Sequence, residues 1–187
     1  MLSIAVITGS TRPGRSNEAV ARWVYNTAKE RNDAEFELVD IAEYNLPLLD
    51  EPMLPVLQQY MRQHTREWAT KVESFDAYVF VTPEYNYGTS AALKNAIDYL
   101  SREWNNKAAG FVSYGGAGGV RAVQQLRLTL GAVMVATVSA QVTLSLFTDF
   151  DNFTAFKPAP LHTREAHAML DQVIAWGHAL RSVRSAN

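Results

Sequence analysis

The chain has 187 residues, enough for one domain with a full hydrophobic core, and it contains no cysteine, which excludes disulfides, thiolate metal sites and thiol nucleophiles. Hydrophobic residues make up 48% and charged residues 19% of the sequence, as in an ordinary globular protein. The formal net charge of -2 is too small to attract nucleic acid or an anionic membrane, so neither is expected as a partner.

The N-terminal apolar run, Ile4-Ala5-Val6-Ile7, is too short for the core of a signal peptide and has no basic flank. No window of the sequence approaches the roughly 20 apolar residues that a membrane span needs. The glycosylation sequon Asn152-Phe153-Thr154 is therefore interpreted as fortuitous. Together these features predict a cytoplasmic protein.

Short β-branched runs alternate with longer segments of helical periodicity along the chain. Strands are predicted at residues 3–8, 35–41, 76–82, 110–114 and 133–142. Helices are predicted at residues 17–31, 55–75, 90–103, 120–130 and 162–184. Long loops are expected at 45–55, which is rich in proline, and at 145–161, which is rich in phenylalanine.

This alternation predicts an α/β fold, a three-layer sandwich with a parallel sheet between two layers of helices. No change of composition marks a boundary, so residues 1–187 are expected to form a single domain. For five strands the flavodoxin-like order 2-1-3-4-5 is expected, with the topological switch point between the first and third strands. Ligands bind at the carboxyl ends of strands near such a point, so the loops after strands one, three and four are the candidate site.

The loop after the first strand belongs to "ITGSTRPGRSN", residues 7–17. It lacks the lysine of a Walker A loop and the three spaced glycines of a dinucleotide fingerprint. It does combine hydroxyl and guanidinium groups at a helix N-terminus, which suits a single phosphate ester better than a pyrophosphate. Those groups belong to Ser10, Thr11, Arg12, Arg15 and Ser16. The alternative is a surface turn with Ser16 as an ordinary helix cap.

The loops after the third and fourth strands have different compositions. The loop after the third strand belongs to "TPEYNYGTSAALKNAIDYL". Tyr85 and Tyr87 offer flat surfaces, and the backbone groups around them could line the polar edge of a planar heterocycle. A plain turn of similar composition is the alternative. The loop after the fourth strand belongs to "SYGGAGGVRA", residues 113–122. Its four glycines allow the backbone to approach a ring or another helix closely. A flexible turn is the alternative. Taken together, the three loops favour a mononucleotide with a flat heterocycle over ATP or a dinucleotide.

The sequence resembles the NADPH-dependent FMN reductase family in its motifs and in their order. These motifs are "GSTRPGRSN", "PEYN" followed by "LKNAIDYL", and "SYGGAGG". That family is a flavodoxin-like branch that includes quinone and azo-dye reductases. The resemblance covers residues from about 3 to about 140, and "LPLLDEP" also recurs in many members. It implies FMN as cofactor, NADPH as electron donor, and a quinone, free flavin or azo compound as the small-molecule acceptor.

The resemblance also implies roles for matching residues. The FMN phosphate would be held by Ser10, Arg12, Ser16 and Asn17. The isoalloxazine would lie beside Pro83, Glu84, Tyr85 and Asn86, mostly at backbone groups. Its far side would be closed by Ser113, Gly115 and Gly118.

Family members are commonly homodimers, sometimes homotetramers, and the resemblance implies a contact face that includes Leu93, Ile97, Leu100 and Trp104. Segment 147–160 matches no family pattern and is a candidate for controlling substrate access. The role of Arg15 is open, because members vary widely at that position.

If FMN is bound, the redox chemistry belongs to the cofactor and a ping-pong mechanism is expected, so no side chain is assigned as catalytic. The sequence has no G-x-S-x-G elbow, and its four histidines lack metal-binding spacing, so no metal site is expected. Three alternatives stay open: an electron-carrying flavodoxin, a flavin-dependent redox sensor, and a degenerate site without flavin. Flavodoxins tend to be strongly acidic, which the net charge of -2 disfavours.

Overall fold

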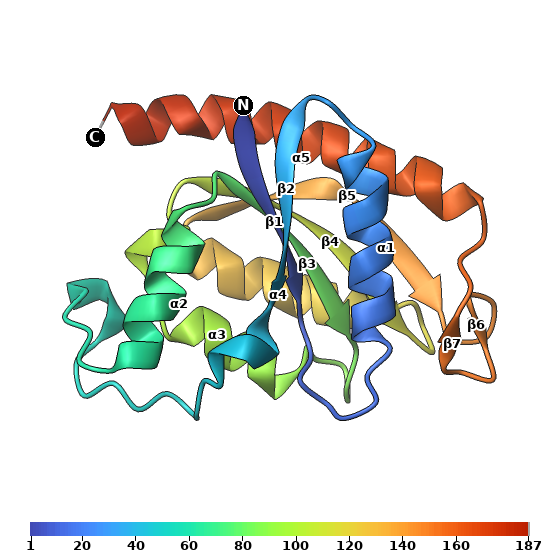
Figure 1. Ribbon diagram of the computed structural model, residues 1–187, viewed down its shortest axis with the longest axis horizontal. Coiled ribbons are helices and arrows are strands. Elements are labelled where there is room, and N and C mark those ends of the chain that lie inside the picture. The colour runs from blue at the N-terminus through green and yellow to red at the C-terminus, as the bar shows by residue number, and fades with distance from the viewer. Residues whose placement is uncertain (187) are drawn as a thin grey trace.

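The computed structural model describes residues 1–186, which form a sheet of parallel strands in the order β2-β1-β3-β4-β5 (Figure 1). The strands are β1 (Leu2–Thr8), β2 (Ala34–Asp40), β3 (Ala77–Pro83), β4 (Lys107–Gly115) and β5 (Val135–Ser145). The predicted strand order is confirmed. The switch point falls between β1 and β3, which pair in parallel from Ile4 opposite Ala77 to Thr8 opposite Val81.

Helices cover both faces of the sheet, so the predicted three-layer sandwich is confirmed. The helices are α1 (Asn17–Lys29), α2 (Gln63–Glu73), α3 (Ala91–Asp98), α4 (Val120–Ala132) and α5 (Leu161–Ser185). α1 and α5 contribute buried side chains to the cluster on one face, whereas α2, α3 and α4 contribute to the cluster on the other (Figure 1).

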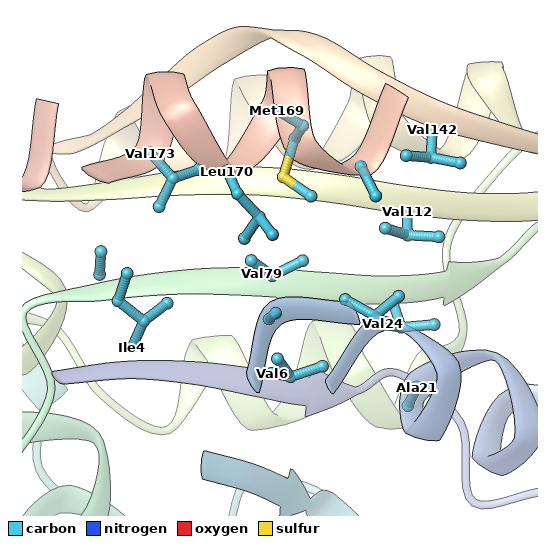
Figure 2. Packing of buried hydrophobic residues seen from close by; sticks show 14 of the residues in the cluster. Ile4, Val6, Ala21, Val24, Val79, Val112, Val142, Met169, Leu170 and Val173 are labelled. Atoms are coloured by element: carbon cyan, nitrogen blue, oxygen red, sulfur yellow. The ribbon is translucent and has the colours of Figure 1, made fainter. Parts of the chain in front are cut away.

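The strands are apolar on both faces because both faces are covered. In β3, Val79 and Val81 point toward α1 and α5, while Tyr78 and Phe80 point toward the opposite layer. Figure 2 shows Met169, Leu170 and Val173 of α5 packed over valines of the central strands. The opposite layer is aromatic, with the Tyr78 and Trp104 rings 5.0 Å apart.

The helix predicted at residues 55–75 is wrong in its first part. A 3₁₀ helix occupies Pro55–Leu57, Gln58 is left-handed with φ 53°, and α2 begins only at Gln63. The Glu51 carboxylate accepts hydrogen bonds from the N–H groups of Met61 and Arg62, both at 2.9 Å, and so fastens this segment as an ordered loop. The helix predicted at 90–103 is also shorter, since α3 ends at Asp98.

The phenylalanine-rich loop predicted at residues 145–161 contains a small hairpin. β5 continues to Ser145, and β6 (Phe150–Asp151) then pairs with antiparallel β7 (Ala155–Phe156). We call residues 145–160 the β6–β7 segment. It lies beside the carboxyl end of β5 and below the start of α5 (Figure 1).

The residues expected at a subunit contact are not on the surface. Leu93, Ile97, Leu100 and Trp104 are each no more than 2% exposed, because they pack against the sheet in the core. That expectation about the contact face is therefore wrong.

Candidate functional site

The loops after β1, β3 and β4 meet at the carboxyl edge of the sheet, as predicted. We call them the first loop (residues 9–16), the tyrosine loop (83–90) and the glycine loop (115–119). The Ser90 hydroxyl donates to the Gly9 carbonyl at 2.6 Å and joins the first two loops. The Glu84 N–H donates to the Tyr114 carbonyl at 3.1 Å and joins the second to the end of β4.

In the first loop, Arg15 serves the protein's own structure. Its guanidinium donates to the Ser10 carbonyl and is paired with Asp40 at the end of β2 and with Glu18 at the start of α1. Burial opposes ionisation of Asp40, but hydrogen bonds from the Ala42 N–H, the Thr8 hydroxyl and Arg15 outweigh it and lower the pKa of Asp40. Arg15 is therefore held on the inner side of the loop as a charged brace.

Asn17 and Ser10 are buried at the base of the same loop. The Asn17 side chain accepts from the Gly9 N–H and donates to the Val81 carbonyl, both at 2.9 Å, which fixes the start of α1 to β1 and β3. Ser10 is 1% exposed, and its hydroxyl oxygen accepts from the Arg12 N–H at 3.3 Å. These two side chains shape the loop from within.

Three groups of the first loop face outward. Arg12 is exposed, and within residues 1–186 its guanidinium has no carboxylate partner. The Ser16 hydroxyl donates to the Thr154 carbonyl at 3.2 Å. The first N–H groups of α1 follow directly and, like those of any helix, have no partner within the helix. A cation, a hydroxyl and a helix N-terminus together suit an anion.

The tyrosine loop is a two-residue hairpin. Tyr85 and Gly88 exchange backbone hydrogen bonds of 2.9 and 3.0 Å, and both Asn86 and Tyr87 have positive φ, which is the pattern of a type I′ turn. Tyr85 is 41% and Tyr87 63% exposed. The hairpin therefore presents two aromatic rings at the edge of the site, while Pro83 is buried as the last residue of β3.

Glu84 connects the tyrosine loop to α4. Its carboxylate accepts from the N–H groups of Arg121 and Ala122 at 3.1 and 3.4 Å and is paired with the Arg121 guanidinium. That guanidinium lies 4.0 Å from the centre of the Tyr87 ring, which orients the ring by a cation–π contact. Arg121 lies in the quoted motif, but its partners are set only by the fold, so sequence reasoning missed its role.

Most of the glycine loop packs against the protein itself. The buried Ser113 hydroxyl donates to the Gly118 carbonyl at 2.7 Å. A Cβ at Gly118 would lie 3.1 Å from Thr143 of β5, and one at Gly115 would lie 3.3 Å from Glu84, so both glycines permit internal packing. Gly116 and Ala117 are the exposed residues of this loop. Direct contact with a ligand is thus left to residues 116 and 117.

Segment 147–160 borders the site, and its contact partners too were not predictable from the sequence. A Cβ built on Gly116 would lie 3.7 Å from the Phe147 ring, so that ring lies beside the glycine loop. Thr154 meets Ser16 of the first loop through the bond described above. The β6–β7 segment therefore closes the rim between the first loop and the glycine loop.

A cavity of about 400 Å³ adjoins the first loop on the side of α3. Its lining consists of Thr11, Ile41, Ala42, Asn45, Leu46, Ala92 and Ala96. Among residues 1–186, no three histidine, aspartate or glutamate side chains are grouped closely enough to hold a metal ion. No helix within that range is both long and apolar enough to span a bilayer.

A parallel sheet of this order, with a first loop suited to an anion and aromatic rings at the neighbouring strand end, is typical of a flavodoxin-like mononucleotide-binding protein. Residues 2–149 match the family model for NADPH-dependent FMN reductase. The chain belongs to that family and is an oxidoreductase that uses FMN with NAD(P)H.

Individual relatives agree with this assignment. An NAD(P)H-dependent FMN reductase from Nectria sp is 39% identical over 168 residues, which are 86% of this chain and 84% of that protein. One from Schizosaccharomyces pombe is 39% identical over 145 residues, covering 76% of this chain and 72% of the relative. A quinone reductase from Escherichia coli is 32% identical over 137 residues, or 69% of each chain.

Solved structures agree on the fold. FerB, a flavoenzyme NAD(P)H:(acceptor) oxidoreductase from Paracoccus denitrificans, superposes with a TM-score of 0.75 at 21% identity, covering 96% of this chain and 98% of that one. Flavodoxin 1 from Bacillus cereus gives 0.53 at 14% identity, covering 96% and 97%. These likenesses support the flavodoxin-like architecture.

Proposed function

We propose that this chain binds FMN at the three loops and transfers a hydride from NADPH, through FMN, to a quinone, free flavin or azo compound by a ping-pong mechanism. The observation that carries the proposal is the exposed Arg12, without a carboxylate partner in the part of the chain that the structure describes, beside the N-terminus of α1, because this pair of features complements a terminal phosphate. When bound, FMN supplies the redox chemistry. The protein's part is to bind, orient and shield.

The proposed binding residues divide into two groups. Groups that face outward would contact FMN directly: the Arg12 guanidinium and the exposed edges of Tyr85 and Asn86. The Ser16 hydroxyl would join them by exchanging the Thr154 carbonyl for a phosphate oxygen. The other residues support the loops from within, through the packing and hydrogen bonds described above. These are Ser10, Asn17, Pro83, Glu84, Ser113, Gly115 and Gly118.

The proposal is tested by the visible spectrum of the protein loaded with FMN and freed of excess flavin, followed by anaerobic addition of NADPH. Flavin absorption that stays with the protein and bleaches on addition supports a nicotinamide-dependent reductase. Absorption that stays but does not bleach would favour an electron carrier or redox sensor. A protein that takes up no FMN would refute the assignment of the first loop.

Location and assembly belong to the same proposal. We propose a cytoplasmic protein that assembles as a homodimer or homotetramer. The apolar side chains exposed after β2 support an assembly, because Leu48, Leu54 and Met61 are each at least 65% exposed. Light scattering on the FMN-loaded protein gives the mass directly, and a monomer at all concentrations would refute the assembly.

A further inference from the structure

Two phenylalanine rings stand exposed on the β6–β7 segment, outside the roles assigned above. Phe147 is 70% and Phe153 58% exposed, and their ring centres lie 5.6 Å apart at an interplanar angle of 89°. This edge-to-face geometry is the favoured one for an aromatic pair, so the two rings form one unit. We call it the phenylalanine pair.

The base under this pair is rigid. Asp149 is 2% exposed and accepts from the Ser145 N–H at 2.9 Å and the Ala159 N–H at 3.3 Å, while its carboxylate meets the His162 ring at 2.9 Å. The Phe150 ring is buried 5.9 Å from the ring of Tyr114 in β4. The segment is thus fastened at both ends and beneath, although its outer rings are in solvent.

Phe153 lies at the tip of the β6–β7 hairpin. Asn152 and Phe153 have φ of 51° and 61°, and the Thr154 N–H donates to the Asp151 carbonyl at 3.2 Å, which is the pattern of a type I′ turn. This turn favours asparagine followed by glycine, because a bulky side chain is disfavoured in the left-handed region. A rigid base therefore holds an exposed aromatic side chain at a turn position that glycine usually occupies.

The position of the pair defines what it can touch. The Phe147 ring lies beside Gly116 of the glycine loop, 3.7 Å from where a Cβ of that residue would be, and the tip of the segment contacts the first loop at Ser16. The pair therefore stands on the rim of the proposed cofactor site. It offers apolar ring surface and no charge, so it suits a flat, apolar ligand and gives nothing to a hydrophilic anion.

We propose that the phenylalanine pair determines the specificity for the electron acceptor and selects flat, apolar, quinone-type molecules. This inference rests on the proposed function and adds the side chains that select among its acceptors. Loss of one ring removes an aromatic contact of about 0.5–1.5 kcal/mol, which corresponds to about twofold to tenfold in affinity for such an acceptor.

The test measures acceptor binding without turnover. Isothermal titration calorimetry gives the Kd of menadione for the oxidised, FMN-loaded protein in the absence of nicotinamide, for wild type, Phe147→Ala and Phe153→Ala. Leu128→Ala is the matched control, since Leu128 is 80% exposed on α4, toward the end of that helix away from the glycine loop. We expect a twofold to tenfold weaker Kd in both phenylalanine variants and no change in the control.

Further measurements separate the other possible occupants. The FMN Kd, the rate of bleaching by NADPH, the KM for ferricyanide and the molecular mass should all match wild type. An unchanged menadione Kd overturns the inference. So does an equal loss of FMN affinity, a raised KM for NADPH or a changed mass, because the rings would then serve the cofactor, the nicotinamide or a second copy. If wild type binds FMN but NADPH does not bleach it, the proposed function itself has failed.

Discussion

Two arginines three positions apart in the first loop have opposite environments. Arg15 is braced by Asp40 and the Ser10 carbonyl, whereas Arg12 is exposed with its guanidinium free of carboxylate partners within residues 1–186. The sequence presented both as cations for a phosphate and left the role of Arg15 open. The choice between them depends on Asp40, which the fold brings from the end of the neighbouring strand.

Arg12→Ala should weaken FMN binding about tenfold to hundredfold, because a charge-assisted hydrogen bond contributes about 1.5–3 kcal/mol. The thermal unfolding midpoint of the flavin-free protein should stay unchanged, since the side chain is exposed. Fluorescence titration with FMN measures the affinity. Arg22→Ala, an exposed arginine on α1, is the control and should bind like wild type; an Arg12 variant that also binds like wild type would contradict the assignment.

Lys107 is a buried cation at the opposite edge of the sheet. It is 4% exposed and donates to the Val72 carbonyl and the Tyr78 hydroxyl, both at 3.0 Å. Burial, assisted by the charge of Arg184, lowers the pKa of Lys107 to about 8. In the unfolded chain a lysine pKa is about 10.4, so between these two values the unfolded state binds more protons than the folded state.

The free energy of unfolding should therefore rise with pH in this window. From pH 7.5 to 9.5 we expect a contribution of about 1–2 kcal/mol from Lys107, which Lys107→Met should lack. Urea unfolding across this range measures it, as the difference between wild type and Lys107→Met, in which the ionisation of tyrosines in the unfolded chain cancels. Lys29→Met, an exposed control on α1, should retain the rise. Parallel curves for wild type and the Lys107 variant would show that the lysine stays charged.

At the scale of elements, the sequence predicted the strands well and the helix ends poorly. β-branched runs covered on both faces are recognisable without tertiary information, and they led to the correct sheet order. The start of α2 depends on Glu51, a side chain from the preceding loop. The apolar stripe on α3 was assigned to a subunit contact, because periodicity does not tell a face that meets the sheet from one that meets a partner.

The same limit applies to the loops of the candidate site. The sequence located all three loops, because each follows a strand that ends at the same sheet edge. It treated Asn17 and Ser113 as ligand contacts, but their side chains bind the Val81 and Gly118 carbonyls. Those carbonyls become neighbours only in the folded chain, so residue type alone did not separate the supporting groups from the exposed ones.

Glu84 makes α4 and the tyrosine loop one unit. Glu84→Gln should lower stability by about 1–2 kcal/mol, because the carboxylate caps the first turn of α4. For a chain of this size the thermal midpoint should fall by about 2–8 °C. Differential scanning calorimetry of the flavin-free protein measures the change. Glu35→Gln, an exposed glutamate on β2, should leave the midpoint in place; equal midpoints in both variants would mean that the cap contributes nothing.

The β6–β7 segment should open separately from the core. Asp149→Asn removes the charge that holds it, so chymotrypsin should cut after Phe147 and Phe153 about tenfold faster, for a loss of about 1.4 kcal/mol. Asp151→Asn is the control in the same hairpin, since Asp151 is exposed and paired only with Lys157 at 3.4 Å within residues 1–186. Mass spectrometry identifies the cuts. Equal rates in both variants would contradict the anchoring role.

That anchor also has a defined pH range. Burial opposes ionisation of Asp149, but hydrogen bonds from the Ser145 and Ala159 N–H groups and the Thr148 hydroxyl, with the nearby His162, lower its pKa. A carboxylate with a lowered folded pKa contributes stability above its unfolded pKa of about 3.9 and loses it as pH falls through the folded pKa. Protection of the segment's amides, measured by hydrogen exchange and corrected for the intrinsic exchange rate, should therefore persist from neutral pH down to about pH 4.

At the scale of the whole molecule, the site is assembled from loops that the sheet holds in place, so its occupancy should stabilise the fold. FMN at a hundred times its Kd should add about 2.7 kcal/mol to the free energy of unfolding, or about 5–10 °C in the thermal midpoint. Thermal unfolding followed by circular dichroism measures the shift. Riboflavin, which lacks the phosphate, is the control ligand and should give a clearly smaller shift. An equal shift would mean that the phosphate contributes nothing to binding.

The place of α5 has a consequence for biosynthesis. Met169, Leu170 and Val173 cover valines of β3, β4 and β5, and Gly177 lets the helix approach Leu2 of β1 (Figure 2). A ribosome delivers these side chains after all the strands that they cover. Until α5 emerges, much of one apolar face of the nascent sheet stays exposed to solvent. Such exposed faces are prone to aggregation. We expect a chaperone that binds this apolar face during the last stage of synthesis to raise the yield of folded protein.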